Sequence, residues 1–198
     1  MPAAKVEKFK LAFFSIPKSA STSIKCTLFR LREGVDWSGI PDRVHPQFPT
    51  YFPIMPKDFL GLEDFYKFTV VRDPIERLLS SYNNRVHYHK DIANHLTKIY
   101  GSEANLRQLF PDLCFFPDIN NYILNLDSYQ KLCHSIMHHT IPSFYFIGAD
   151  LYFFDKVYPI NRLKELEQDI TKLTGQYTIF KRFQENDRKY KFEDLSIA

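Results

Sequence analysis

The sequence predicts an α/β fold with a mainly parallel central sheet flanked by helices. Short continuous apolar runs alternate with segments whose apolar residues recur at helical spacing, and this alternation is typical of parallel βα units. Two of the runs, Leu11–Ile16 and Phe65–Val71, have the length of buried strands. The 198 residues contain no repeat and no long linker, so we expect a single domain over residues 1–198.

The first apolar run opens a strand–loop–helix unit. Leu11–Ile16 stops at Pro17, and a polar stretch follows it. Ile24, Leu28 and Leu31 then recur at helical spacing. The chain therefore passes from a buried strand through a short polar loop into a helix.

The second apolar run opens a similar unit. Arg72-Asp73-Pro74 ends the strand, and a helical pattern runs from Ile75 to about Tyr100. Asp73 is a predicted N-cap, with Pro74 at the first helical position and Glu76 two residues later. The sequence thus predicts a second strand-to-helix junction with a well-marked helix start.

The remaining segments are assigned by their breaks and periodicity. Five prolines between positions 35 and 59 make regular structure improbable there, and we expect an ordered excursion. Residues 102–140 are predicted to be mostly helical, and another apolar run follows over Phe144–Ile147. A further strand is expected over Phe153–Tyr158, and an amphipathic helix over Arg162–Leu173, closed by Gly175.

Composition excludes several classes of protein. A net charge of +3 does not indicate a nucleic-acid surface, because duplex binding usually needs a dense face of Lys and Arg. Cys26, Cys114 and Cys133 are odd in number and form no CxxC pair, so we expect free thiols rather than disulfides or zinc. No run reaches the ~18 apolar residues of a membrane span, and Met1–Lys10 lacks the apolar core of a secretory signal. We therefore expect a cytoplasmic protein that binds no nucleic acid.

The first junction has the composition of an anion site. A helix N-terminus offers unpaired N–H groups and the positive end of the helix dipole. The loop adds small residues, hydroxyls and one cation: Pro17, Lys18, Ser19, Ala20, Ser21, Thr22 and Ser23. This is not a Walker A loop, because the lysine comes first and glycine is missing. The alternative is a solvated N-cap with Lys18 exposed.

The second junction supplies a guanidinium and a hydroxyl. Arg72 lies at the carboxyl end of a predicted strand, where open α/β sheets bind their ligands. Ser80 lies two turns into the following helix. Together an arginine fork and a hydroxyl can hold a phosphate through charge-assisted hydrogen bonds. The alternative is a surface ion pair between Arg72 and Asp73, which would contribute little stability.

In this order the two motifs resemble those of the sulfotransferases that use 3′-phosphoadenosine 5′-phosphosulfate (PAPS), specifically the carbohydrate (family 2-like) branch. Family members carry a strand–loop–helix of the form Ile-Pro-Lys-x-x-Ser-Thr-Ser that grips the 5′-phosphosulfate. They also carry a strand–Arg-Asp-Pro–helix with a serine eight residues after the arginine, which grips the 3′-phosphate. Arg72 and Ser80 have that spacing. The resemblance is strong over residues 9–32 and 65–86 and implies a P-loop NTPase-like core.

The resemblance assigns the donor site to Pro17, Lys18, Ser19, Ala20, Ser21, Thr22, Ser23, Arg72 and Ser80. One departure concerns the loop, where Ser19-Ala20 replaces the Thr-Gly of the commoner Lys-Thr-Gly-Ser-Thr form. Phosphate binding should survive this change if position 20 does not need a positive φ. The terminal segment 182–196 is compositionally similar to the family segment that closes over the nucleotide.

The implied reaction is in-line transfer of a sulfuryl group from PAPS to an acceptor hydroxyl, which leaves adenosine 3′,5′-bisphosphate. Lys18 is the candidate for stabilising the leaving oxygen. His45 is the candidate base, because related carbohydrate sulfotransferases place a histidine between the two motifs. A loop histidine without a chemical role is the alternative. We expect no metal, since no carboxylate pair suggests a magnesium site.

The acceptor is expected to be a carbohydrate or another hydroxyl compound. Phe48–Phe59 can stack on sugar rings or pack onto the domain, and the sequence does not separate these. His138 and His139 are candidates for the acceptor side, whereas His87, His89 and His95 are expected on the surface. Two other functions stay open: a P-loop kinase-like phosphotransferase and a non-catalytic nucleotide-binding module.

Overall fold

The computed structural model describes residues 3–48 and 60–181, together with residues 183, 190 and 195. The chain divides into two compact units. Residues 1–72 and 142–185 form the first unit, and residues 73–141 and 186–198 form the second. Residues 49–59 of the aromatic segment Phe48–Phe59, which can stack on sugar rings or pack onto the domain, and nearly all of the terminal segment 182–196 lie outside the described residues.

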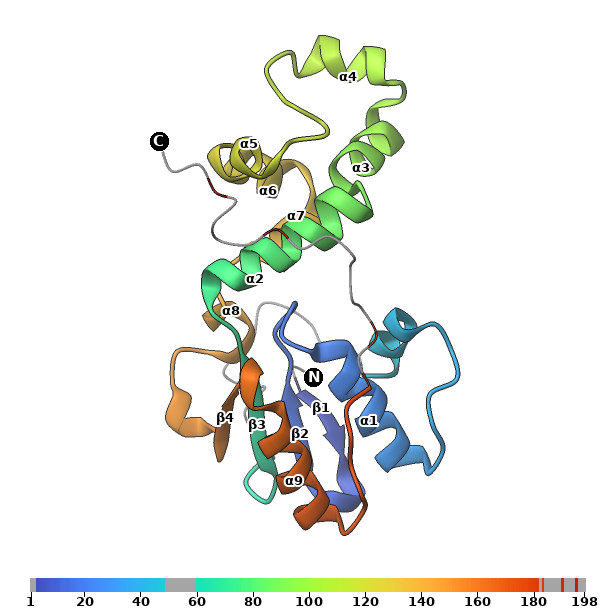
Figure 1. Cartoon of the computed structure of the whole chain (residues 1–198), viewed down its shortest axis with the longest axis vertical. Coiled ribbons are helices and arrows are strands. Elements are labelled where there is room, and N and C mark those ends of the chain that lie inside the picture. Colours follow the sequence, from blue (N-terminus) through green and yellow to red (C-terminus); the bar gives the residue numbers. More distant parts are fainter. Residues whose placement is uncertain (1–2, 49–59, 182, 184–189, 191–194, 196–198) are drawn as a thin grey trace. The chain divides into compact units, whose positions relative to one another are not determined.

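The first unit is built on a sheet that has four strands within the described residues (Figure 1). Its order is β1 (Ala3–Val6), β2 (Leu11–Phe14), β3 (Tyr66–Val71) and β4 (Lys156–Pro159). The β1 strand pairs with β2 antiparallel, whereas the β2–β3 and β3–β4 pairs are parallel. The predicted α/β class with a mainly parallel sheet is therefore confirmed. Sequence reasoning did not find β1, because four residues with two alanines give no clear pattern.

Helices of the first unit follow the strands along the chain. They are α1 (Ser21–Glu33), α8 (Phe144–Ile147) and α9 (Leu163–Thr174), with 3-10 turns η1 (Glu7–Phe9), η2 (Pro41–Gln47), η5 (Leu151–Phe153) and η6 (Ile160–Arg162). The predicted helix that Gly175 closes is confirmed. The expectation of no regular structure over 35–59 is wrong for η2, where Pro41 at the first position suits a helical turn.

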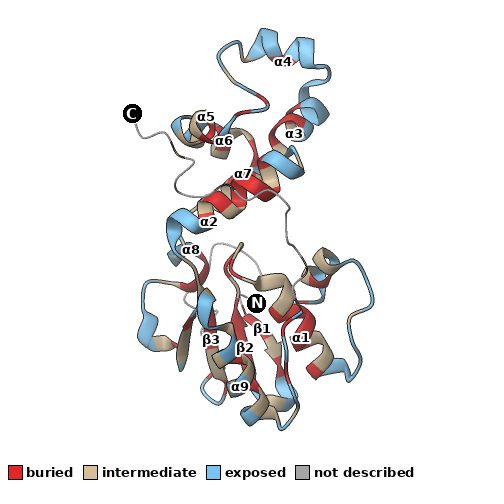
Figure 2. Cartoon of the chain, viewed as in Figure 1, coloured by how far each residue is buried: buried red, intermediate tan, exposed pale blue. Residues whose placement is uncertain are grey.

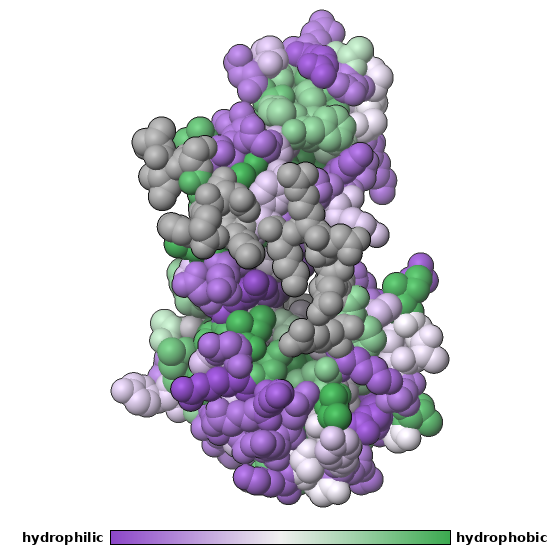
Figure 3. All heavy atoms as spheres, in the orientation of Figure 1, coloured by the Kyte–Doolittle hydropathy of each residue, from purple (hydrophilic) through white to green (hydrophobic). Residues whose placement is uncertain are grey.

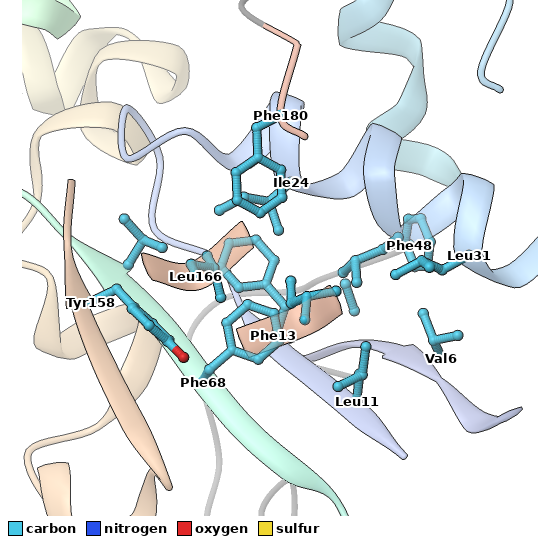
Figure 4. Close-up of a cluster of buried hydrophobic side chains, with 14 residues drawn as sticks. Val6, Leu11, Phe13, Ile24, Leu31, Phe48, Phe68, Tyr158, Leu166 and Phe180 are labelled. Atoms are coloured by element: carbon cyan, nitrogen blue, oxygen red, sulfur yellow. The ribbon is translucent and has the colours of Figure 1, made fainter. Parts of the chain in front are cut away.

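One face of the sheet carries the core of the first unit, shown in Figure 4. Alternate residues of a strand point to the same face, so Phe13 of β2 meets Phe68 of β3, with ring centroids 5.2 Å apart. Both α1 and α9 pack on this face through apolar residues at helical spacing: Ile24, Leu28, Leu31, Leu166 and Ile170. Phe14 belongs to the opposite face, where Phe153 and Phe154 pack edge-on against it.

Burial follows the same pattern across the first unit. Buried residues gather on the strands and along α1 (Figure 2). The outward face of α9 is hydrophilic in the space-filling view (Figure 3), in agreement with its amphipathic sequence. Among the described residues, no helix is both long and apolar enough to cross a bilayer.

All regular secondary structure described in the second unit is helical. Its elements are α2 (Pro74–Ser81), a π-helical segment η4 (Tyr82–Tyr88), α3 (Asp91–Tyr100), α4 (Glu103–Leu109), α5 (Ile119–Leu124), α6 (Leu126–Leu132) and α7 (His134–Thr140). The mostly helical prediction for 102–140 is confirmed. The single long helix predicted to Tyr100 is wrong, because η4 interrupts it and Lys90 takes a left-handed conformation with φ 54°.

The start of α2 is the one that the sequence predicts. The Asp73 carboxylate accepts hydrogen bonds from the amides of Ile75 and Glu76, at 2.9 and 3.0 Å. These contacts satisfy two of the unpaired N–H groups of the first turn. Pro74 at the first helical position needs no partner, so the residue pattern alone fixes the helix start.

Arg77 joins α2 to α7 inside the second unit. Its side chain is buried, and its guanidinium donates to the carbonyl oxygens of His139, Thr140 and Ile141. These carbonyls lie at the end of α7, where a helix has no further amides to pair with them. Burial lowers the pKa of Arg77. The arginine therefore caps one helix from within another.

We predict that Arg77→Met destabilises the second unit by about 2 kcal/mol, because three part-buried carbonyls lose a charged donor. The free energy of unfolding from urea titration measures the loss. Arg107→Met is the matched control, since Arg107 forms only an exposed i,i+4 pair with Glu103 and its loss should cost less than about 0.5 kcal/mol. Equal effects of the two substitutions would contradict the capping role.

Candidate anion-binding and catalytic site

Two strand-to-helix junctions meet at one edge of the sheet in the first unit. Because β2 and β3 are parallel neighbours, the loop after Phe14 and the residue after Val71 leave the sheet at the same edge. Arg72 Nη1 donates to the carbonyl oxygen of Lys18, at 3.3 Å. The structure thus brings together the lysine loop and the arginine that the sequence singled out separately.

The loop backbone is held in an uncommon conformation. Lys18 and Ala20 both have positive φ, 66° and 59°, in the left-handed region. Between them the amide of Ser19 donates to the carbonyl of Ile16, at 3.3 Å. The side chain of Ser19 is fully buried, and no partner for its Oγ is found among the described residues. A buried hydroxyl in this position is an available hydrogen-bond donor.

Helix α1 begins without a side-chain cap. Ala20 is its N-cap residue, and an alanine has no oxygen to accept from the first amides. The N–H groups of Ser21, Thr22 and Ser23 have no intrahelical acceptor because they belong to the first turn. An anion at this end would receive those hydrogen bonds and the favourable field of the helix dipole.

Ala20 occupies the position where the commoner loop form has glycine. The sequence analysis made phosphate binding conditional on this position not needing a positive φ, and the structure shows that it does. An L-residue pays roughly 1–2 kcal/mol in the left-handed region. The loop therefore keeps the shape associated with glycine, at the expense of backbone strain.

His45 lies against the start of α1. Its Nε2 is 3.1 Å from Thr22 Oγ1, so the candidate base is hydrogen-bonded to a residue of the candidate anion site. His45 and Thr22 are both half-buried, as a group open to a substrate has to be. The structure thus brings together three sequence-predicted elements within the first unit: the loop, Arg72 and His45.

Side chains of α1 hold η2 in this place. Lys25 is buried one turn after Thr22, and its Nζ lies 3.4 Å from the carbonyl oxygen of Phe48. Arg32 Nη1 donates to the carbonyl of Gln47 at 3.0 Å, and its guanidinium lies 4.4 Å from the ring centroid of Phe48. Sequence reasoning missed both anchors, although the i,i+3 spacing of Thr22 and Lys25 on one helix face was a usable signal.

The sequence matches the family model described as the sulfotransferase family over residues 5–197. The chain belongs to the sulfotransferase family. No curated protein and no solved structure gives a significant match. Sulfotransferases of this family have a P-loop NTPase-like fold, and the mostly parallel sheet with its strand–loop–helix unit agrees with that class.

Ser80 of this sulfotransferase lies on α2 of the second unit and is half-buried. Its predicted contact with a phosphate stays a prediction. The other candidate histidines also belong to the second unit. His139 Nδ1 lies 2.7 Å from the carbonyl of Ser135, and the rings of His138 and His139 meet edge-on at 5.1 Å. In the part of the chain that the structure describes, no cluster of three or more His, Cys, Asp or Glu could hold a metal.

The site residues fit a phosphate-bearing donor. The first-turn amides of α1 have no side-chain cap, and the Ser19 hydroxyl has no partner among the described residues. Both are therefore donors to which an anion could bind. Lys18 and Arg72 add cationic side chains from both junctions. These groups could hold an anion through charge-assisted hydrogen bonds.

We predict that Ala20→Gly stabilises the protein by about 1 kcal/mol, because glycine adopts a positive φ without steric cost. Binding of adenosine 3′,5′-bisphosphate should be retained. Denaturant unfolding and calorimetry measure the two quantities. Ala12→Gly in β2 is the control, and it should destabilise the protein by about 1 kcal/mol, since glycine weakens a strand. Destabilisation by both substitutions would contradict the strain at position 20.

Lys25 predicts a pH dependence of stability. Burial lowers the pKa of Lys25 from 10.5 to about 8. Between these values the unfolded chain holds the proton and the folded protein does not, so the free energy of unfolding rises with pH across this window. The shift corresponds to about 3 kcal/mol. The free energy of unfolding is lower by this amount below about pH 8 than above about pH 10.5.

The measurement is the difference in free energy of unfolding between the wild type and Lys25→Met from pH 7 to pH 10. The free energy of unfolding of the wild type should increase relative to that of Lys25→Met as the pH rises. Cys26, whose pKa burial raises to about 11, contributes with the opposite sign but is present in both proteins. A difference that is constant with pH would show that Lys25 keeps its ordinary pKa.

Proposed function

We propose that this sulfotransferase moves the sulfuryl group of PAPS onto a hydroxyl of an acceptor, which is a carbohydrate. The observation that carries the proposal is the hydrogen bond between Thr22 and His45. It puts an imidazole at the start of a helix whose first-turn amides have no intrahelical acceptor and no side-chain cap among the described residues. A group that can take a proton is therefore within reach of the place where the donor would bind.

The donor would be held by the residues of the two junctions. The amides and hydroxyls of residues 19–23 would bind the 5′-phosphosulfate, with Pro17 and Ala20 allowing close approach of the backbone. Arg72 would bind the 3′-phosphate through its guanidinium fork, and Ser80 would add a hydroxyl to the same phosphate. Lys18 would place its ammonium beside the bridging oxygen.

PAPS supplies an activated sulfuryl group that the acceptor oxygen attacks in line. A bond forms between that oxygen and sulfur while the bond from sulfur to the 5′-phosphate oxygen breaks. The products are the sulfated acceptor and adenosine 3′,5′-bisphosphate. Lys18 stabilises the charge that grows on the leaving oxygen, and His45 takes the proton that the acceptor hydroxyl releases. This proposal needs no metal.

The acceptor proposal rests on the resemblance to the carbohydrate branch and on the geometry around His45. The imidazole of His45 on η2 is half-buried and lies 3.1 Å from Thr22 Oγ1. His138 and His139 remain candidates for contacts on the acceptor side. The cytoplasmic location expected from the sequence stays a prediction.

A radiolabelled-PAPS transfer screen over glycans, lipid-linked sugars and small alcohols tests the function. We expect transfer to a carbohydrate, with turnover reduced about 10²–10⁴-fold in His45→Gln and by about 10²-fold or more in Lys18→Met. Adenosine 3′,5′-bisphosphate should still bind to His45→Gln. His95→Gln, a histidine of α3, is the matched control and should keep wild-type turnover.

Binding of adenosine 3′,5′-bisphosphate without transfer to any acceptor would favour the non-catalytic module instead. Full turnover by His45→Gln would remove His45 from the proton transfer. These two results are independent, because the first concerns the activity and the second concerns one residue.

Arg72→Ala should weaken adenosine 3′,5′-bisphosphate by on the order of 2–3 kcal/mol, because a charged fork to the 3′-phosphate is lost. AMP lacks that phosphate and should lose much less affinity. Isothermal calorimetry with both nucleotides measures the two changes. Arg30→Ala, in the last turn of α1, is the control and should affect neither nucleotide. Equal weakening of both nucleotides by Arg72→Ala would contradict the assignment of Arg72 to the 3′-phosphate.

A further inference from the structure

Thr22 is part of the candidate anion site and is also the hydrogen-bond partner of His45. Its place in the first turn of α1 puts it among the residues that would bind the anionic end of the donor. Its hydroxyl oxygen is also the hydrogen-bond partner of His45 Nε2, at 3.1 Å. The two residues are 23 positions apart, so the contact depends on the packing of η2 on α1 and not on local sequence.

The hydroxyl of Thr22 can serve only one acceptor at a time. A threonine has a single O–H, and a neutral imidazole has a single nitrogen lone pair that can accept. In the tautomer that lets Nε2 act as a base, Thr22 donates its proton to Nε2 and occupies the lone pair that must take the acceptor's proton. In this arrangement the base is blocked.

An anion at the start of α1 competes for the same proton. A hydrogen bond to an ionised oxygen is roughly twice as strong as one between neutral groups. Rotation about the Cβ–Oγ1 bond redirects the hydroxyl without moving the backbone. His45 cannot follow it readily, because Lys25 and Arg32 hold the backbone of η2 and Phe48 against α1. Anion binding therefore separates the hydroxyl from the imidazole.

We propose that Thr22 is a positioning residue that keeps the His45 Nε2 lone pair occupied until the donor binds, and releases it when the donor's anionic group takes the Thr22 proton. This inference rests on the proposed function. The site then becomes competent for proton removal only when the sulfuryl donor is present, which sets the order donor first and acceptor second. After the nucleotide product leaves, Thr22 blocks the base again.

The test is ¹⁵N NMR of protein labelled at histidine, with the His45 signals assigned by His45→Gln. The probe is adenosine 3′,5′-bisphosphate, added at a constant pH at which the imidazole is neutral. In the wild type, the ¹⁵N resonance of Nε2 should move downfield, towards the position of a pyridine-type nitrogen without a hydrogen bond. In Thr22→Val the resonance should start near that position and move much less.

Two further variants separate the hydrogen bond from general effects. Thr22→Ser keeps the hydroxyl and should restore the wild-type response. Thr27→Val removes a hydroxyl of α1 outside the candidate anion site, which donates to the carbonyl oxygen of Ser23, and should leave the response of Nε2 unchanged. The charged groups on the elements packed around His45, namely Asp42, Arg43, Lys25 and Arg32, are the same in all of these proteins.

The outcomes are distinct. Calorimetry first establishes binding of the nucleotide, and failure to bind would overturn the proposed function and the inference with it. Binding with no movement of the wild-type Nε2 resonance would overturn the inference alone. So would a protonated Nε2 in the free protein, or an equal ligand response in Thr22→Val. The wild-type titration decides the question even if Thr22→Val does not fold.

Discussion

The parallel pairing of β2 with β3 is the constraint on which the site depends. Parallel neighbours deliver their carboxyl ends to the same edge of a sheet, so the lysine loop and Arg72 emerge together although more than fifty residues separate them. The stacked rings of Phe13 and Phe68 fix this register from within the core. A slip of one strand by one residue would turn its ring to the wrong face and displace the two junctions relative to each other.

At this edge of the sheet the backbone is strained, and some hydrogen-bond donors have no partner among the described residues. Lys18 and Ala20 are left-handed without being glycine, and Ser19 buries a hydroxyl. Such features persist only where the surrounding structure holds them, and they concentrate at ligand sites. Lys25, which holds the chain after η2 against α1, also lowers the stability of the fold, because burial of its amine lowers its pKa to about 8. An anionic ligand could accept hydrogen bonds from the first-turn amides of α1 and from the Ser19 hydroxyl, which has no partner among the described residues.

Most of the fold and of the candidate site could be predicted from local patterns. Short apolar runs located β2 and β3, and Asp73-Pro74 located the start of α2, because these signals lie within a few residues. Lys18 and Arg72 were singled out by the two strand-to-helix motifs, and His45 was taken from the resemblance to carbohydrate sulfotransferases. The anchors Lys25 and Arg32 were missed, since their partners are backbone carbonyls of a segment that carries no periodic signal. The break at Lys90 was missed because nothing in a lysine marks a left-handed residue.

The central claim is that the start of α1 binds the anionic end of a nucleotide. Amide chemical-shift mapping during titration with adenosine 3′,5′-bisphosphate tests it most directly. The account predicts that the largest amide shifts fall on Ser19 to Ser23, and that they saturate with the calorimetric affinity. Saturable binding that leaves these five amides unshifted would contradict it.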